Sequence, residues 1–212
     1  PTDAPTDEPT DEPTDEPTDE PTDEPTDEPT DEPTDEPTEE PTDEPTEEDP
    51  YGIYEISPDK LTVNGAKKTY KGILISLTVP ADWLALEQHF EDGSVYYFRE
   101  PSVNGCWLIF STAESQFAIH RTQEEYLSLF SGWGRENVKI LSCAKEKLSG
   151  FNCTKVVYSY TIDGASYVSI RYDNVITGLC MYEFDIDYPA AQKETFAPVF
   201  DEIIGSIALQ AY

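Results

Sequence analysis

Between residues 51 and 212 the apolar positions recur either every second residue, as in strands, or about every 3.6 residues, as in helices. Most segments alternate between apolar and polar residues, as half-buried strands do. Two pairs of such segments are joined by Asn64-Gly65 and Asp163-Gly164, which are strong short signals for β-hairpin turns. The remaining pattern predicts strands at residues 73–79, 94–99, 106–111, 138–147, 153–162, 167–176 and 179–188.

The helical period appears twice. Thr122 and Glu125 form the pattern of a capping box, which predicts a helix start at this point. An apolar stripe follows, made by Tyr126, Leu127, Phe130 and Trp133.

A second helix is predicted near the end of the sequence, where apolar residues recur at i, i+3, i+4 and i+7. Pro198 has no N–H and belongs in the first turn of a helix, so the predicted start lies near Thr195. The apolar stripe is Phe196, Val199, Phe200, Ile203, Ile204 and Ile207.

The order of the predicted elements is strands, one helix, further hairpin strands and a terminal helix. This order predicts an α+β domain, in which helices pack on the faces of an antiparallel sheet. The alternating βαβ units of a parallel sheet are absent from the sequence. We expect a single globular head over residues 51–212.

The first 50 residues form a different kind of segment, a Pro-Thr-Asp-Glu repeat with 24 carboxylates and no lysine or arginine. This composition predicts a disordered spacer, with a reach on the order of 150 Å if fully extended. Two other interpretations stay open. The carboxylates could collect calcium weakly, and the threonines could carry O-linked glycans.

Charge excludes one class of function. The head holds 20 acidic and 13 basic residues, and its densest basic cluster is Lys67, Lys68 and Lys71. This is too little for nucleic-acid binding. No apolar run is long enough to span a membrane, so we expect no direct membrane insertion. The sequence starts at proline and its only methionine is Met181, so we expect a signal or lipid anchor upstream.

Four cysteines lack the C-x-x-C spacing of a zinc site, and no cofactor motif is present. They could be small buried side chains, which we favour, or could form disulfides outside the cell. The four are Cys106, Cys143, Cys153 and Cys180.

Three motifs of the head resemble the PsbP-like fold, which photosystem II extrinsic proteins share with bacterial surface lipoproteins. They are Ile75-Ser-Leu-Thr-Val-Pro-Ala-Asp-Trp83, Leu148-Ser-Gly-Phe-Asn-Cys-Thr-Lys155 and Phe200-Asp-Glu-Ile-Ile-Gly-Ser-Ile207. The resemblance implies an α/β/α sandwich without a common active site. Together with the acidic repeat, it leads us to expect a cell-surface or secreted protein of a Gram-positive envelope.

Alternating carboxylates form the first candidate site. Glu183, Asp185 and Asp187 share one face of a predicted strand, and Asp173 on the preceding strand is a possible fourth ligand for calcium. The competing interpretation is an ordinary solvated sheet face.

Aromatic residues form the second candidate site, because exposed Tyr and Trp are common binding anchors. Trp83, Tyr96, Tyr97 and Trp133 are the candidates, and core packing is the competing interpretation for each.

These features favour a non-catalytic, monomeric binding or accessory domain, displayed on an acidic spacer and recognising an extracellular protein or glycan. An extracellular hydrolase that uses His89 and nearby carboxylates as acid–base groups is the main alternative. A structural assembly subunit, associating through a sheet edge, is the third.

Overall fold

The computed structural model describes residues 49, 51–114, 117–178 and 180–211. The chain divides into two units, Pro1–Thr46 and Glu47–Tyr212. The predicted acidic spacer lies outside the described residues except for Asp49, so only the head is discussed below.

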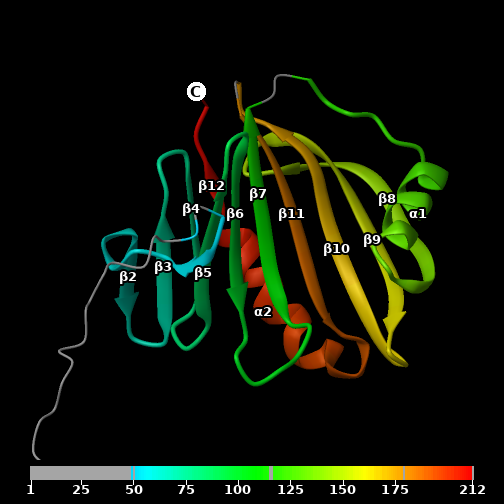
Figure 1. The fold of residues 1–212 in the computed structure, drawn as a ribbon, viewed down its shortest axis with the longest axis horizontal. Helices are drawn as coiled ribbons and strands as arrows, with labels where there is room; N and C mark the ends of the chain where they lie inside the picture. The colour runs from blue at the N-terminus through cyan, green and yellow to red at the C-terminus, as the bar shows by residue number, and fades with distance from the viewer. Residues whose placement is uncertain (1–48, 50, 115–116, 179, 212) are drawn as a thin grey trace, which may run out of the picture. The chain divides into compact units, whose positions relative to one another are not determined.

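A large antiparallel sheet of eight strands dominates the head, in the order β1-β5-β6-β7-β11-β10-β9-β8 (Figure 1). Hairpins make most of the pairings, and β11 returns to pair with β7 at the centre. The strands are β1 (Ile53–Glu55), β5 (Leu84–Phe90), β6 (Gly93–Arg99), β7 (Trp107–Glu114), β8 (Glu136–Leu148), β9 (Phe151–Ile162), β10 (Ala165–Ile176) and β11 (Cys180–Pro189).

A second sheet of four strands has the order β12-β4-β3-β2. Its strands are β2 (Leu61–Asn64), β3 (Lys67–Lys71), β4 (Ile75–Pro80) and β12 (Ala208–Leu209). Helix α1 (Gln123–Gly132) lies beside β8 and β9, whereas α2 (Lys193–Ser206) runs behind the middle strands in Figure 1. Two short 3-10 helices, η1 (Pro58–Lys60) and η2 (Ala190–Gln192), precede β2 and α2.

The two faces of the large sheet have separate cores. The small sheet and α2 cover one face, where Tyr70 packs on Phe98 and Phe110, and Phe200 packs on Tyr188. On the other face α1 covers β9 with a smaller cluster, made by Tyr126, Phe130, Val156, Tyr158 and Tyr160. The prediction of an antiparallel α+β fold with helices on its sheet faces is confirmed.

Local signals predicted most elements. Thr122 caps α1, and its capping box with Glu125 is complete. Asp163 and Gly164 form the two-residue turn between β9 and β10, with φ of 49° and 77°. The other hairpin is also present, although its turn is centred on Gly65 and Ala66.

Four details differ from the sequence-based expectation. The sequence pattern does not predict strands β1, β5 and β12, and His89 lies in β5. Leu127 points away from the core and is 40% exposed. Helix α2 begins at Lys193, two residues before the expected start, so Pro198 lies in its second turn. The second sheet was not anticipated.

Candidate functional site

The four carboxylates predicted as metal ligands lie together on the α1 face of the large sheet, but they surround an arginine. Arg171 of β10 is directly opposite Asp185 of β11 in the antiparallel register. Its Nη2 atom lies 2.6 Å from Glu183 Oε2 and 3.4 Å from Asp173 Oδ1, and its Nη1 donates to Asp185. The guanidinium is therefore the shared ion-pair partner of three acidic side chains.

Asp173 is fully buried and has two further partners. Arg121 donates to Asp173 Oδ2 over 2.9 Å, and the Tyr126 hydroxyl donates to the same oxygen over 2.6 Å. Arg121 belongs to the segment that precedes α1, and Tyr126 belongs to α1 itself. These two hydrogen bonds fix the start of α1 against the sheet.

Asp187 forms a neighbouring polar cluster. Its carboxylate accepts hydrogen bonds from Trp107 Nε1 over 2.9 Å and from the Tyr160 hydroxyl over 2.8 Å. Arg135 Nη2 lies 3.7 Å from Asp187, and its guanidinium carbon lies 4.5 Å from the centre of the Tyr160 ring. The carboxylate thus has donors enough to remain buried.

Burial and charge shift the pKa values in different directions within this group. Burial raises the pKa of Asp185 to about 6, although Arg171 partly opposes the effect. Burial likewise raises the pKa of Glu183. For Asp173 burial acts in the same direction, but hydrogen bonds from Glu183 and Tyr126 and the two arginines outweigh it and lower the pKa. Because these carboxyl groups interact closely, their protons are released in steps that belong to the group and not to single residues.

In this arrangement the four carboxylates expected as calcium ligands are paired with arginines. Among the described residues no group of three or more His, Cys, Asp or Glu side chains is placed to hold a metal ion. Each of the four carboxylates is instead ion-paired with at least one internal cation, Arg171, Arg121 or Arg135. The face is also not an ordinary solvated one, because Asp173 and Asp187 are buried.

The four aromatic candidates do not form one groove. Trp83 is 3% exposed and packs on Phe200 of α2. Tyr96 stacks on Phe110 on the α2 side of the sheet, while Tyr97 points to the opposite side and donates to Gln88. Trp133, which follows α1, is the one candidate with a large solvent-exposed surface, at 45%.

His89 has two polar neighbours on the sheet surface. Its Nδ1 atom lies 2.8 Å from Ser94 Oγ, and its Nε2 atom lies 3.6 Å from Glu87 Oε2. Glu87 is also paired with Lys60 at 3.0 Å. Ser94 of β6 therefore contacts His89 of the paired strand β5, and His89 in turn contacts Glu87 of β5.

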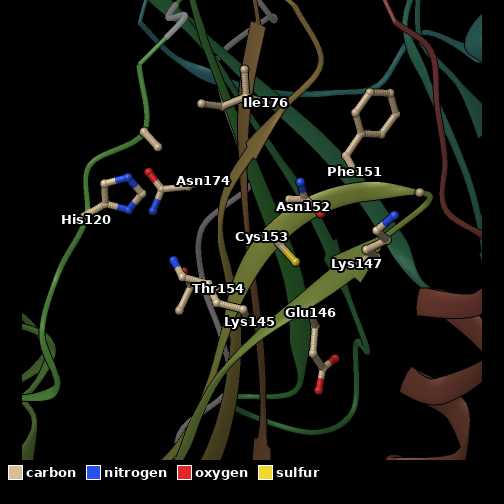
Figure 2. A pocket seen from close by; sticks show the side chains of 12 residues that line it. His120, Lys145, Glu146, Lys147, Phe151, Asn152, Cys153, Thr154, Asn174 and Ile176 are labelled. Atoms are coloured by element: carbon tan, nitrogen blue, oxygen red, sulfur yellow. The ribbon is translucent and has the colours of Figure 1, made fainter.

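A pocket that the sequence analysis did not predict lies where the β8–β9 hairpin passes under the segment before α1 (Figure 2). Its volume is about 780 Å³. The side chains of Lys145, Lys147 and His120 are exposed around it, while Thr154 and Asn174 are buried beneath. Lys145 Nζ donates to Thr154 Oγ1 over 2.7 Å.

The walls of this pocket are fixed by hydrogen bonds. Asn174 binds the backbone of Ile119 twice, accepting from its N–H over 2.6 Å and donating to its carbonyl over 2.9 Å. Asn174 has φ of 61°, which asparagine tolerates better than most residues, and it lies within the irregularity, between Tyr172 and Val175, at which β10 and β11 shift register. On the other side Ser149, in the β8–β9 turn, accepts from the backbone of Leu209.

The pocket is basic in an otherwise acidic head. Glu146 also lines it, but its carboxylate points away from the other side chains in Figure 2 and lies 3.5 Å from Lys155. Within the described part of the chain, no carboxylate forms an ion pair with Lys145 or Lys147. A preformed pocket with unpaired ammonium groups can hold an anionic group, because little ordering is needed on binding.

Sequence comparison adds information on the N-terminal residues. The family described as "PT disordered repeat" matches residues 1–33 and 17–49. No curated protein matches the chain.

Solved structures resemble the head at low sequence identity. The solution structure of cyanobacterial PsbP from Synechocystis sp. PCC 6803 is 12% identical with a TM-score of 0.49, covering 70% of this chain and 97% of that one. The LpqN structure from Mycobacterium tuberculosis, described as involved in cell envelope biogenesis, is 13% identical with a TM-score of 0.44, covering 74% and 91%. The matches include the PsbP type that the sequence motifs predicted, and they concern the fold alone.

The cysteines and the helices of the head are described as follows by the structure. The structure leaves Cys106, Cys143, Cys153 and Cys180 as free thiols. In the described stretches of the head, neither helix is long and apolar enough to cross a membrane.

Proposed function

We propose that the head is a non-catalytic binding domain that holds an anionic group of an extracellular partner in the pocket of Figure 2. The observation that carries the proposal is the pair of unpaired lysines, Lys145 and Lys147, at a preformed pocket in a head of net negative charge. An anion-bearing glycan or an acidic protein segment has the chemistry to fill it.

Placement outside the cell is part of this proposal. The acidic Pro-Thr-Asp-Glu repeat is suited to a spacer that holds the head away from the surface of a Gram-positive envelope. A monomer is favoured by the outer strand β8, because sheet edges with irregular pairing and lysines resist edge-to-edge association. The pairing of β8 with β9 shifts register twice, and the strand carries Lys139, Lys145 and Lys147.

Glycan and peptide arrays probed with the full chain test the proposal, followed by calorimetric titration of any ligand found. We expect acidic ligands to bind, and the double variant Lys145→Gln/Lys147→Gln to bind about tenfold more weakly, since each exposed ion pair contributes roughly 0.7 kcal/mol. Lys139→Gln on the same strand is the matched control and leaves affinity unchanged. Equal affinity in the double variant would reject the pocket as the binding site.

The hydrolase alternative has one observation in its favour, the contact of His89 with Ser94 and Glu87. A serine nucleophile also needs N–H donors aimed at the developing oxyanion. Ser94 lies in β6, between β5 and β7, where backbone N–H groups lie in the plane of the sheet and bind neighbouring strands or side chains. The geometry therefore favours binding over hydrolysis. Ester turnover by the wild type that is lost in Ser94→Ala would reverse this conclusion.

A further inference from the structure

Trp133 presents a rigid aromatic surface on the α1 face of the large sheet, apart from the pocket of Figure 2. Its indole ring is contacted by Phe130 at 5.4 Å between ring centres. The guanidinium carbons of Arg135 and Arg171 lie 4.8 and 5.5 Å from the ring centre. Arg171 is buried, so it supports the ring from the protein side, while nearly half of the Trp133 side chain faces solvent. The ring needs little ordering before it binds a ligand.

Hydrogen-bond donors and acceptors both lie near the Trp133 ring. Arg171 links Trp133 to Glu183 and Asp185, whose side chains are 23% and 19% exposed. These two carboxylates supply acceptor oxygens, whereas Arg135, which also contacts the ring, is a donor. A ligand on Trp133 therefore meets an apolar surface bordered by both acceptors and donors.

Three buried atoms on the sheet face that Arg171 shares lack hydrogen-bond partners among the described residues. They are Arg171 Nε, Asp185 Oδ1 and Ser169 Oγ. The antiparallel register places them together, since Arg171 faces Asp185 and Ser169 lies two positions earlier on the same side of β10. Buried polar atoms are nearly always satisfied, so this cluster has unused capacity for a water that bridges it to a polar ligand.

Charge selects the class of ligand. A cation on the ring is disfavoured by the two guanidinium groups that already contact it, and an anion is disfavoured by Glu183 and Asp185. An uncharged polyhydroxylated ring escapes both penalties, because its C–H face packs on the indole and its hydroxyls both donate and accept. We propose that Trp133, with Glu183, Asp185 and Arg135 around it, forms a binding subsite for a neutral saccharide unit, distinct from the anionic pocket.

Nuclear magnetic resonance of the tryptophan indole N–H groups tests this inference on the full chain. The chain has three such groups, and Trp133→Phe identifies the signal of Trp133. The probes are cellotetraose, chitotetraose and maltotetraose. With at least one of them we expect a saturable shift of the Trp133 signal with a Kd of about 0.1–10 mM, while the signal of the buried Trp83 stays in place.

Variants separate this subsite from the anionic pocket and from the exposed surface of α1. Trp133→Ala should weaken saccharide binding, measured by calorimetry, at least about tenfold, and Glu183→Gln about threefold. Leu127→Ala, an exposed change on α1, and Lys145→Gln/Lys147→Gln should leave it unchanged, so that failure of the anionic pocket does not affect the result. The inference is overturned if none of the three saccharides shifts the Trp133 signal at about 20 mM, or if Trp133→Ala binds as tightly as the wild type.

Discussion

Replacing Arg171 by methionine keeps most of the side-chain length but removes the cation shared by three carboxylates. Asp173 retains Arg121, whereas Glu183 and Asp185 lose the ion-pair partner that they have in the structure. Removing one partner of a buried ion pair costs about 3–5 kcal/mol. Because Glu183 and Asp185 are partly exposed, we expect about 3 kcal/mol at neutral pH, which lowers the Tm by roughly 6–12 °C for a domain of this size.

The sign of the pH dependence makes this prediction specific. Without Arg171 the pKa values of Glu183 and Asp185 rise further above their unfolded values. The contribution of these carboxyl groups to stability is therefore present below their unfolded pKa and is lost as pH rises through the folded pKa. The loss of stability should be smaller at about pH 5 than at about pH 7.5.

Urea unfolding followed by fluorescence at both pH values measures the effect. Lys139→Met, an exposed change on β8, is the control and should alter stability by less than about 0.5 kcal/mol. Arg171→Met/Asp185→Asn should recover part of the loss, because it removes one of the unpaired carboxylates. A loss below about 1 kcal/mol, or one of equal size at both pH values, would refute the role assigned to Arg171.

Three further predictions concern the head and the repeat. Burial raises the pKa of Asp185 to about 6, so Asp185→Asn should gain stability relative to the wild type between about pH 5 and about pH 7 in urea unfolding; a flat difference contradicts this. Asn174→Ala loses both hydrogen bonds to Ile119 at a positive φ, and should cost about 2 kcal/mol and speed hydrogen exchange of the Ile119 amide; unchanged exchange rejects the fixed wall. Deleting residues 1–48 should leave the Tm of the head within about two degrees in calorimetry, because a repeat without large apolar side chains has little to pack with; a larger fall would show docking.

The fold could be predicted because its signals are local. Asp163-Gly164 and the Thr122 capping box specify their turn and helix start within four residues of sequence. Strand β5 escaped prediction because its core-facing positions include Glu87, a carboxylate that is buried only because Lys60, distant in sequence, pairs with it. A tertiary ion pair of this kind leaves no periodic signal.

The candidate site could be predicted only in part. Alternation placed Glu183, Asp185 and Asp187 on one face, and the structure brings them together. The partner Arg171 follows from the register of β10 against β11, which the spacing of single residues does not specify. The pocket was missed for the same reason, because its lining comes from the segment before α1, the β8–β9 hairpin and β10, which are joined only by tertiary packing.

Backbone amide chemical shifts of the full chain, titrated with tetragalacturonate and with a glycerol phosphate oligomer, test the proposed anionic pocket most directly. With at least one of these anions, the largest shifts should cluster at residues 117–121 and 145–154 and at Asn174. They should be absent in Lys145→Gln/Lys147→Gln and retained in Lys139→Gln. Shifts centred elsewhere on the head, or no shift with either anion at about 10 mM, would contradict the assignment of this pocket as an anion-binding site.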